Sequence, residues 1–287
     1  MFFIKNRIQE LRYIFFSKLY LRLLSVDECG NYFLEDLECL GRGGFGEVYK
    51  VNVYNRSKTY ATQCARKYFS PSPENDSTSV REIADLRERF IVEIKTQCTL
   101  NSIGYDLIAP IVLFKKDIER PYFIMVLAEC SLRKAIEDGL DDKEKISAIK
   151  QILNGVKLIH DNNYIHRDLK PENILKYEHG KYKISDFGLV KDLNLIRAEI
   201  KTRFRPNGLG SDGYRAPEIT DGGIFSPRSD IYALGKIIND IYGGTATPAI
   251  RALITKCTHY FSEDRYNTVD ELLVSFCAAV DCIKEAS

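Results

Sequence analysis

The residues of this chain best suited to chemistry lie in the run His166–Asn173, which reads HRDLKPEN. It places an acid at Asp168, a cation two positions on at Lys170 and an amide five positions on at Asn173. A second acid, Asp186, follows thirteen residues after Asn173 and opens an Asp-Phe-Gly turn. The spacing predicts a site that holds a metal-bound triphosphate while a carboxylate orients an incoming hydroxyl.

Glycines follow the spacing G-x-G-x-x-G-x-V from Gly41 to Val48. Because they lack side chains, Gly41, Gly43 and Gly46 let backbone N–H groups approach phosphates closely. The pattern alone is weak, since a tight hairpin turn would also explain it. A dinucleotide-binding fold is disfavoured, because the residues after Gly46 predict a strand and not a helix.

A lysine, Lys67, ends the sequence CARK on a predicted strand that follows the glycine run. A lysine on a strand is ordinarily a solvated surface residue. Here its distance from the glycine run lets it reach the same phosphates. Glu93, on the helix predicted next, is its natural counter-ion.

These motifs occur in one order along the chain, followed by Ala216-Pro217-Glu218. In that order they resemble the motifs of eukaryotic-type (Hanks-type) serine/threonine protein kinases, over roughly residues 34–280. The resemblance implies an α+β, bilobal fold. It consists of a small five-stranded antiparallel N-lobe with one main helix (34–128) and a larger, trimmed helical C-lobe (129–287). A basic, apolar extension (1–33) precedes them.

The resemblance also implies ATP and Mg²⁺ as cofactors. Lys67 would grip the α- and β-phosphates, held by an ion pair with Glu93. Asp186 would bind the Mg²⁺ that bridges the phosphates, and Asn173 would hold a second metal ion. The nucleotide would lie against Gly41, Gly43, Gly46, Val48, Ala65, Lys67, Met125 and Leu127, with the adenine near the lobe-connecting residues 125–128.

Roles in phosphoryl transfer follow from the same resemblance. Asp168 would orient the substrate hydroxyl and accept its proton, and Lys170 would neutralise charge on the transferred group. Lys170 favours serine or threonine as the acceptor, and Ser211 occupies a hydroxyl position that supports this choice. The partner implied is a protein substrate, and the balanced composition gives no reason to expect nucleic acid. Two other classes stay open: a nucleotide-binding pseudokinase scaffold, and a kinase of small molecules.

Three further residues would be structural by the same resemblance. His166 would pack under the metal-binding turn. Glu218 would pair with Arg265. Asp230 would brace the catalytic loop from the helix beneath it.

Two departures from the family pattern stand out. Gln97, four residues after Glu93, is polar where an apolar residue is usual, so it either loosens the alignment of the lobes or forms a hydrogen bond there. After one predicted helix ends at Tyr242, only the six residues 243–248 lead into the next helix, which is predicted from residue 248. A helix common in the family is therefore missing, and a trimmed C-lobe is expected.

A hypothesis of regulation by phosphorylation starts from Arg167, which could bind a phosphate carried by the segment after Asp186. Thr202 is the one hydroxyl residue between Asp186 and Ser211. Phosphorylation of Thr202 is one hypothesis, and an ordinary loop threonine is the other. The acidic residues between Glu137 and Glu144 could attract a basic substrate, but a solvated helix start capped by Asp141 or Asp142 is the simpler interpretation.

The bulk composition is that of an ordinary globular protein. The chain has 287 residues, 45% hydrophobic and 28% charged, with a net charge of +1. Its eight cysteines show no C-x-x-C pair, which favours reduced thiols in a cytoplasmic protein over a disulfide framework.

The N-terminal segment 1–33 is basic and rich in aromatic residues. Its cations interrupt every apolar stretch, so neither a membrane span nor a secretory signal is expected. Residues 1–28 would either pack against the protein or make peripheral contact with an anionic membrane.

Periodicity places the secondary structure. Strands are predicted near 32–40, 46–54, 59–69, 108–115 and 122–127, with a polar loop at 70–79. Helices are predicted at 80–100, 142–161, 230–242, 248–258 and 269–283.

Overall fold

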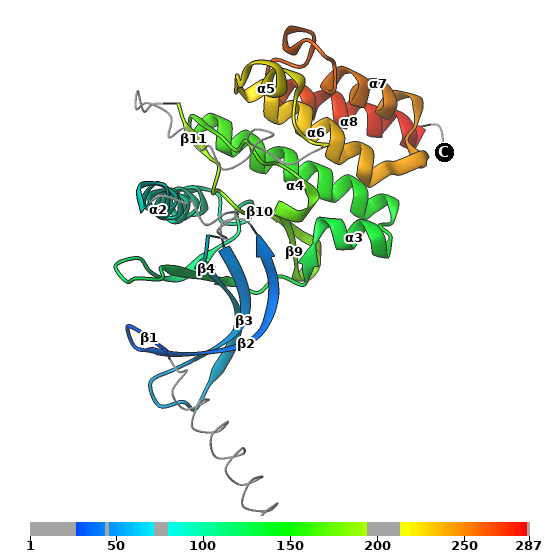
Figure 1. Ribbon diagram of the computed structural model, residues 1–287. Coiled ribbons are helices and arrows are strands. Elements are labelled where there is room, and N and C mark those ends of the chain that lie inside the picture. The colour runs from blue at the N-terminus through cyan, green and yellow to red at the C-terminus, as the bar shows by residue number, and fades with distance from the viewer. Residues whose placement is uncertain (1–26, 44–45, 72–79, 194–212, 286–287) are drawn as a thin grey trace, which may run out of the picture. The chain divides into compact units, whose positions relative to one another are not determined.

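The computed structural model describes residues 27–43, 46–71, 80–193 and 213–285, which group into two compact units (Figure 1). The first unit takes in residues up to 72 together with 112–127. The second comprises residues 73–111 and 128–287. Most of residues 1–33, the loop 72–79, Thr202 and Ser211 lie outside the described residues.

The first unit is built on a six-stranded sheet with the order β1-β2-β3-β4-β6-β5. The prediction had five strands. The additional one is β1, which pairs with β2 although the sequence placed it in the N-terminal extension. Three residues are too few to show the alternation that marks a strand. The strands are β1 Asp27–Cys29, β2 Tyr32–Gly43, β3 Gly46–Tyr54, β4 Ala61–Phe69, β5 Ile111–Lys115 and β6 Tyr122–Val126.

The main helix predicted after the polar loop is α2, Val80–Ile103, which runs three residues beyond the predicted end. Leu86, Phe90 and Ile94 are buried, as their spacing predicted, whereas Ile83 is exposed. Gln97 is buried, and its Nε2 donates a hydrogen bond of 2.8 Å to the carbonyl oxygen of Ala109. Of the two interpretations of this residue, the hydrogen-bonded one is observed.

The helices of the second unit surround one large core. α4 lies against α6 and α8, and α7 packs on both α6 and α8 (Figure 1). The bounds of α4 match the prediction, whereas α3 and α5 were not predicted because six or seven residues carry little periodicity. The helices are α3 Leu132–Asp138, α4 Asp142–Asp161, α5 Pro217–Gly222, α6 Pro227–Tyr242, α7 Pro248–Cys257 and α8 Val269–Glu285.

Capping residues explain where two of these helices begin. Asp141 accepts a hydrogen bond of 2.7 Å from the backbone N–H of Glu144, so it caps α4. This is the simpler of the two interpretations of the acidic residues, a helix start capped by an aspartate. α6 begins three residues earlier than predicted. Ser226 and Ser229 form a capping box there, and Pro227 occupies the first turn.

Short strands lie in the connections between the helices. A three-stranded sheet has the order β10-β9-β7, and β11 pairs with β8. These strands are β7 Cys130–Ser131, β8 Tyr164–Ile165, β9 Ile174–Tyr177, β10 Lys181–Ile184 and β11 Lys191–Asp192.

The trimmed connection after α6 is a single turn of 3-10 helix, Gly243–Thr245. Gly243 has a φ of +52°, in the region that favours glycine. The Thr245 hydroxyl donates to the carbonyl of Tyr242 at 2.5 Å, and Arg251 donates to the carbonyl of Ala246 at 2.6 Å. Tyr242 and Ala246 are buried, so the short turn closes directly onto the helical core.

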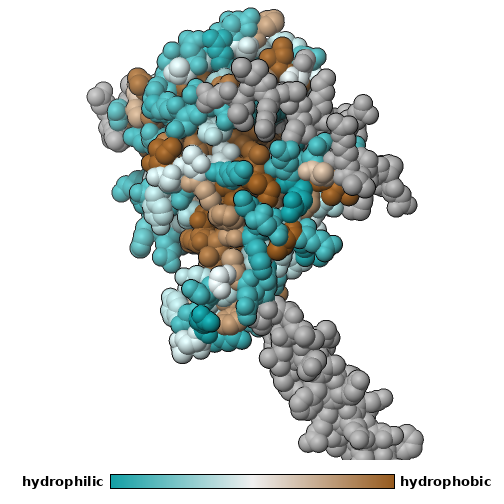
Figure 2. Space-filling model, turned by 90° about the vertical axis from the view of Figure 1, so that its left-hand side faces the viewer, coloured by the Kyte–Doolittle hydropathy of each residue, from teal (hydrophilic) through white to brown (hydrophobic). Residues whose placement is uncertain are grey.

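Hydrophobic residues reach the surface between hydrophilic ones on the face shown in Figure 2. Across the described surface the most exposed include Tyr60, Tyr105, Ile224 and Val274. Such exposure is usual for globular surfaces. Within the described part of the chain, no helix has the length and apolar character needed to cross a bilayer.

An ion pair between Glu218 and Arg265 ties α5 to the segment before α8, as expected. The two guanidinium nitrogens donate to the two carboxylate oxygens at 2.9 and 2.7 Å, and the Arg265 side chain is fully buried. Burial alone would raise the pKa of Glu218, but hydrogen bonds from Arg265 and Ser229 outweigh it and lower the pKa from 4.5.

We expect Glu218→Gln to lower the free energy of unfolding by about 3–5 kcal/mol at neutral pH, because Arg265 would stay buried without its counter-ion. The lowered pKa means that this contribution is complete above pH 4.5 and is lost as the pH falls through the folded-state value. Urea unfolding at a series of pH values should therefore show the free energies of unfolding of the parent and Glu218→Gln converging in acid. Glu263→Gln, at an exposed neighbouring acid, is the control. A difference in the free energy of unfolding that stays constant far below pH 4.5 would contradict this account.

Candidate active site

The register of the first unit's sheet collects predicted nucleotide-binding residues on one face. Lys67 of β4 pairs with Val48 of β3 and with Phe123 of β6, and Ala65 pairs with Met125. Directly paired residues share a side of the sheet, as do residues two apart on a strand. Val48, Ala65, Lys67 and Met125 therefore line one surface, and Leu127 follows directly after β6.

The glycine strands approach this surface closely. A Cβ at Gly46 would lie 2.4 Å from the carbonyl oxygen of Tyr68 and 3.7 Å from Cε of Lys67, so no side chain fits there. At Gly41 the corresponding position is open, with no atom within 4 Å. The Lys67 ammonium lies 5.7 Å from the centre of the Phe123 ring. The face thus combines a side-chain-free approach for phosphates with a cation.

The loop 166–173 of the second unit, which we call the catalytic loop for its predicted role, brings three predicted site residues together. The Lys170 ammonium lies 3.1 Å from Oδ2 of Asp168. Nδ2 of Asn173 donates to the same oxygen at 3.1 Å and to the Asp168 carbonyl at 2.8 Å. Asp168 and Asn173 are both buried. The donors fix the carboxylate and leave the side-chain oxygen of Asn173 available to a metal ion.

Asp186 is placed beside this loop through its neighbours. Ser185 donates from its backbone N–H and its hydroxyl to the carbonyl of Asn173, at 2.9 and 3.0 Å. Asp186 itself has a φ of +61°, which is uncommon for a residue other than glycine. Such strained positions are often found at functional sites.

Glu93 reaches the same turn from α2. A Cβ at Gly188 would lie 3.3 Å from Oδ1 of Asp186 and 3.4 Å from Oε2 of Glu93, so both carboxylates border this glycine. Glu93 is buried. Its predicted ion pair with Lys67 joins residues of different units and stays a prediction.

His166 takes the packing position expected of it. Its ring is fully buried, 5.1 Å from the centre of the Phe187 ring, and its Nε2 lies 3.1 Å from the carbonyl oxygen of Ser185. These contacts hold the Asp-Phe-Gly turn against the catalytic loop.

Asp230 of α6 supports the loop from below. Its carboxylate accepts the backbone N–H groups of His166 and Arg167 at 2.9 and 3.0 Å. His160, in the last turn of α4, places Nε2 2.9 Å from the same carboxylate. Burial opposes ionisation of Asp230, but the His160 contact and the Arg167 N–H outweigh it, so its pKa is lowered. Arg167 has a φ of +72°, and Asp230 holds this strained backbone in place.

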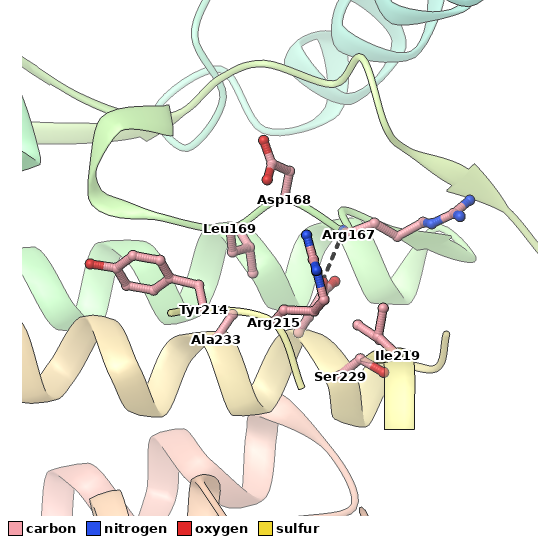
Figure 3. A pocket seen from close by; sticks show the side chains of 9 residues that line it. Arg167, Asp168, Leu169, Tyr214, Arg215, Ile219, Ser229 and Ala233 are labelled. Carbon is pink, nitrogen blue, oxygen red and sulfur yellow. Dashed lines mark hydrogen bonds between the residues drawn. The ribbon is translucent and has the colours of Figure 1, made fainter. Parts of the chain in front are cut away.

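A pocket opens between the catalytic loop and helices α5 and α6 (Figure 3). The side chains of Arg167, Asp168 and Leu169 leave the loop in different directions, and Leu169 points toward the helices. The guanidinium of Arg167 also lies 3.9 Å from the ring centre of Phe225. The remaining lining residues include Tyr214, Arg215, Ile219, Ser229 and Ala233.

A polar network at this pocket was missed from the sequence. Arg133 of α3 donates to Glu172 at 2.8 Å and also contacts Asp240 and the Tyr214 hydroxyl, which donates to Asp240. Burial and the bond to Asp240 raise the pKa of Tyr214 to about 12. The network fixes Tyr214 beside the catalytic loop. Its members are distant in sequence, and no local pattern links them.

The donor set fits the cofactors that the sequence suggested. Among the described residues, no cluster of three or more His, Cys, Asp or Glu side chains could hold a metal on its own. Mg²⁺ typically binds one or two protein carboxylates and completes its shell with water and substrate phosphates. Asp186 and Asn173 supply hard oxygen ligands of that kind. The glycine strands and Lys67 supply what a triphosphate needs.

Comparison with known proteins agrees with the fold. The family model described as protein kinase domain matches residues 34–272. The chain belongs to the protein kinase family by fold and sequence, with the bilobal α+β architecture expected from its motifs.

Relatives come from two kinds of kinase. Cyclin-dependent kinase 12 of Drosophila melanogaster is 29% identical over 75% of this chain and 18% of its own length. Human cyclin-dependent kinase-like 2 is 29% identical over 73% of this chain and 39% of its length. A G-type lectin S-receptor-like serine/threonine-protein kinase of Arabidopsis thaliana is 31% identical over 71% of this chain and 24% of its length. The chain thus spans well under half the length of these relatives.

His160 offers a test of the support beneath the loop. Because an ionised carboxylate only accepts hydrogen bonds, Nε2 of His160 donates to Asp230. We expect His160→Phe to lower the free energy of unfolding by about 1–3 kcal/mol, and to speed amide hydrogen exchange at His166 and Arg167. His160→Gln, which can place an amide donor at the same position, should retain most of the protection. Equal losses in both variants, or unchanged exchange in His160→Phe, would contradict the proposed support.

Proposed function

We propose that this chain is an active serine/threonine protein kinase, which transfers the γ-phosphoryl group of ATP to a hydroxyl of a protein substrate. The observation that carries the proposal is the arrangement around Asp168. Its carboxylate is held by Lys170 and Asn173, in a loop that Asp230 supports. Membership of the protein kinase family supplies the reaction class.

The nucleotide would be held by the surface of Gly41, Gly43, Gly46, Val48, Ala65, Lys67, Met125 and Leu127. Ala65, Met125 and Leu127 offer little side-chain polarity, which suits a purine ring. Asp186 and Asn173 would hold Mg²⁺, which when bound neutralises charge on the phosphate oxygens. Lys67 would hold two of the phosphates, with Glu93 as its counter-ion.

Asp168 would position the acceptor hydroxyl and take its proton on a carboxylate oxygen. The ammonium of Lys170 lies 3.1 Å from Oδ2 of this carboxylate, beside the reacting groups. The same ammonium can neutralise charge that develops on the transferred group. The pocket beside Asp168, lined by Leu169, Tyr214 and Ile219, offers an apolar surface for a residue flanking the acceptor.

The decisive test uses Asp168→Asn, which keeps the shape of the side chain but removes its basicity. With labelled ATP, Mg²⁺ and generic acidic and basic proteins, we expect the rate to fall by about 10²–10⁴-fold relative to the parent. Asp138→Asn, at an exposed acid of α3, is the matched control and should retain full activity. Equal labelling by the parent and Asp168→Asn would reject this role. Nucleotide binding without transfer in the parent would favour the pseudokinase scaffold.

The acceptor class can be tested separately. If Lys170 acts at a serine or threonine hydroxyl as proposed, acid hydrolysis of the labelled substrate should yield phosphoserine and phosphothreonine. Phosphotyrosine as the main product would reject the serine/threonine assignment while leaving protein kinase activity intact. Transfer to free small molecules, with none to proteins, would instead favour the third class of function.

We also infer a cytoplasmic location. The free thiols at Cys29, Cys64, Cys130 and Cys257 support it, because such cysteines suit a reducing compartment. Residues 27 and 28 of the segment 1–28 pack in β1. For the residues before them the two interpretations, packing on the protein or peripheral contact with a membrane, both stay open.

A further inference from the structure

Lys67 has an unusual neighbour in Arg66, whose side chain is almost completely buried at 2% exposure. Neighbouring residues of a strand face opposite sides of the sheet, so Arg66 points away from the surface that Lys67 faces. It enters the small core of the first unit, near Cys64, Tyr122 and Ile124. A buried guanidinium is costly unless charges and hydrogen bonds compensate for its loss of water.

The compensating groups come from three other strands and from Tyr68 of β4 itself. Arg66 forms ion pairs with Asp27 of β1 and, at 3.4 Å, with Asp36 of β2. Its guanidinium lies 4.3 Å from the ring centre of Tyr68 and 3.7 Å from that of Tyr122 on β6. The Tyr68 hydroxyl donates to Asp36 at 2.6 Å. We call Asp27, Asp36, Arg66, Tyr68 and Tyr122 the Arg66 cluster.

Strand β1 joins the two edges of the sheet. It pairs with β2 at one edge, and Lys115 of β5, at the other edge, reaches back to it. The Lys115 ammonium lies 2.9 Å from the carbonyl oxygen of Glu28 and 3.4 Å from Asp27. Asp27 therefore meets cations from both β4 and β5. Asp27 and Glu28, which receive these contacts, precede the family-matched region, which begins at residue 34.

From this geometry we propose that Asp27 positions Lys67 through Arg66. The Arg66 cluster fixes the rotation of β4 about its own axis, because a buried guanidinium held by two carboxylates and two rings cannot turn freely. The same rotation sets the direction of the next side chain, Lys67, toward the glycine strands. Strand β1 thus supports the nucleotide-binding surface from the opposite face of the sheet, and Asp27 is a positioning residue. This inference rests on the proposed function of that surface.

Asp27→Asn in the full chain is the central variant, because it removes one charge with little change in shape. Calorimetric titration with Mg·ATP, well below the unfolding temperature of each protein, should show affinity weakened about 5-fold or more. Glu28→Gln is the matched control: it removes a charge from the adjacent exposed residue of the same strand, and its affinity should match the parent's. Unchanged affinity in Asp27→Asn would overturn the proposal.

A double variant separates positioning from stability. Asp27→Asn leaves Arg66 short of a counter-ion, which also destabilises the fold. Adding Arg66→Met removes the buried charge itself, and such apolar replacement often restores stability. We expect the double variant to regain resistance to urea but not its affinity for Mg·ATP. If affinity returned together with stability, Asp27 would be merely structural and the proposal would fall.

Labelling of Lys67 distinguishes failure of this proposal from failure of the proposed function. An amine-acylating reagent, read out by mass spectrometry without nucleotide, should modify Lys67 at a different rate in Asp27→Asn, while Lys50 on the neighbouring strand should keep its rate. A parent that bound no Mg·ATP would reject the nucleotide-binding role, yet the changed labelling would still uphold the positioning by Asp27. Identical labelling of Lys67 in both proteins would overturn the positioning.

Discussion

One buried carboxylate, Asp230, determines whether the catalytic loop can exist in its observed form. The loop contains Arg167 in a backbone conformation that is unfavourable for arginine, and its N–H groups would be unsatisfied without an acceptor. Asp230 supplies that acceptor from α6, a helix anchored on nearly every side by the large core. The cost of burying the charge is offset by two backbone donors and His160. Through Asp230, the stable helical core therefore holds Asp168 and its neighbours in place.

A second buried charge organises the first unit in the same manner. Arg66 is enclosed by carboxylates and tyrosine rings, where a hydrophobic side chain would have been sufficient to fill the space. An ion pair in such a place adds little net stability, but it fixes geometry, since removing either partner is costly. In both units, as we propose, a charge buried on one side of a segment orients the predicted site residue next to it. Asp230 does this for the loop of Asp168, and Arg66 for the strand of Lys67.

The sequence predicted those parts of the molecule that have a local signature. The apolar spacing was sufficient to place both ends of α4, with Asp141 or Asp142 expected as its cap, and the order of the motifs was sufficient for the family. The pair Glu218 and Arg265 followed from resemblance and is observed. In contrast, Arg66 looks from its sequence like any cation on a strand, because its partner Asp27 lies 39 residues away. The network of Arg133, Tyr214 and Asp240 is equally invisible, with separations of 81 and 107 residues.

The turn between α6 and α7 has a consequence for how the chain length can vary. Gly243 and Gly244 are exposed, and a Cβ at either position would meet no other atom within 4 Å. Extra residues inserted here would extend into solvent, and lengthening a loop costs little free energy. The helices on both sides are fixed by their own burial. This joint can therefore accept a grafted segment or a tag while the chemistry in the rest of the unit is left undisturbed.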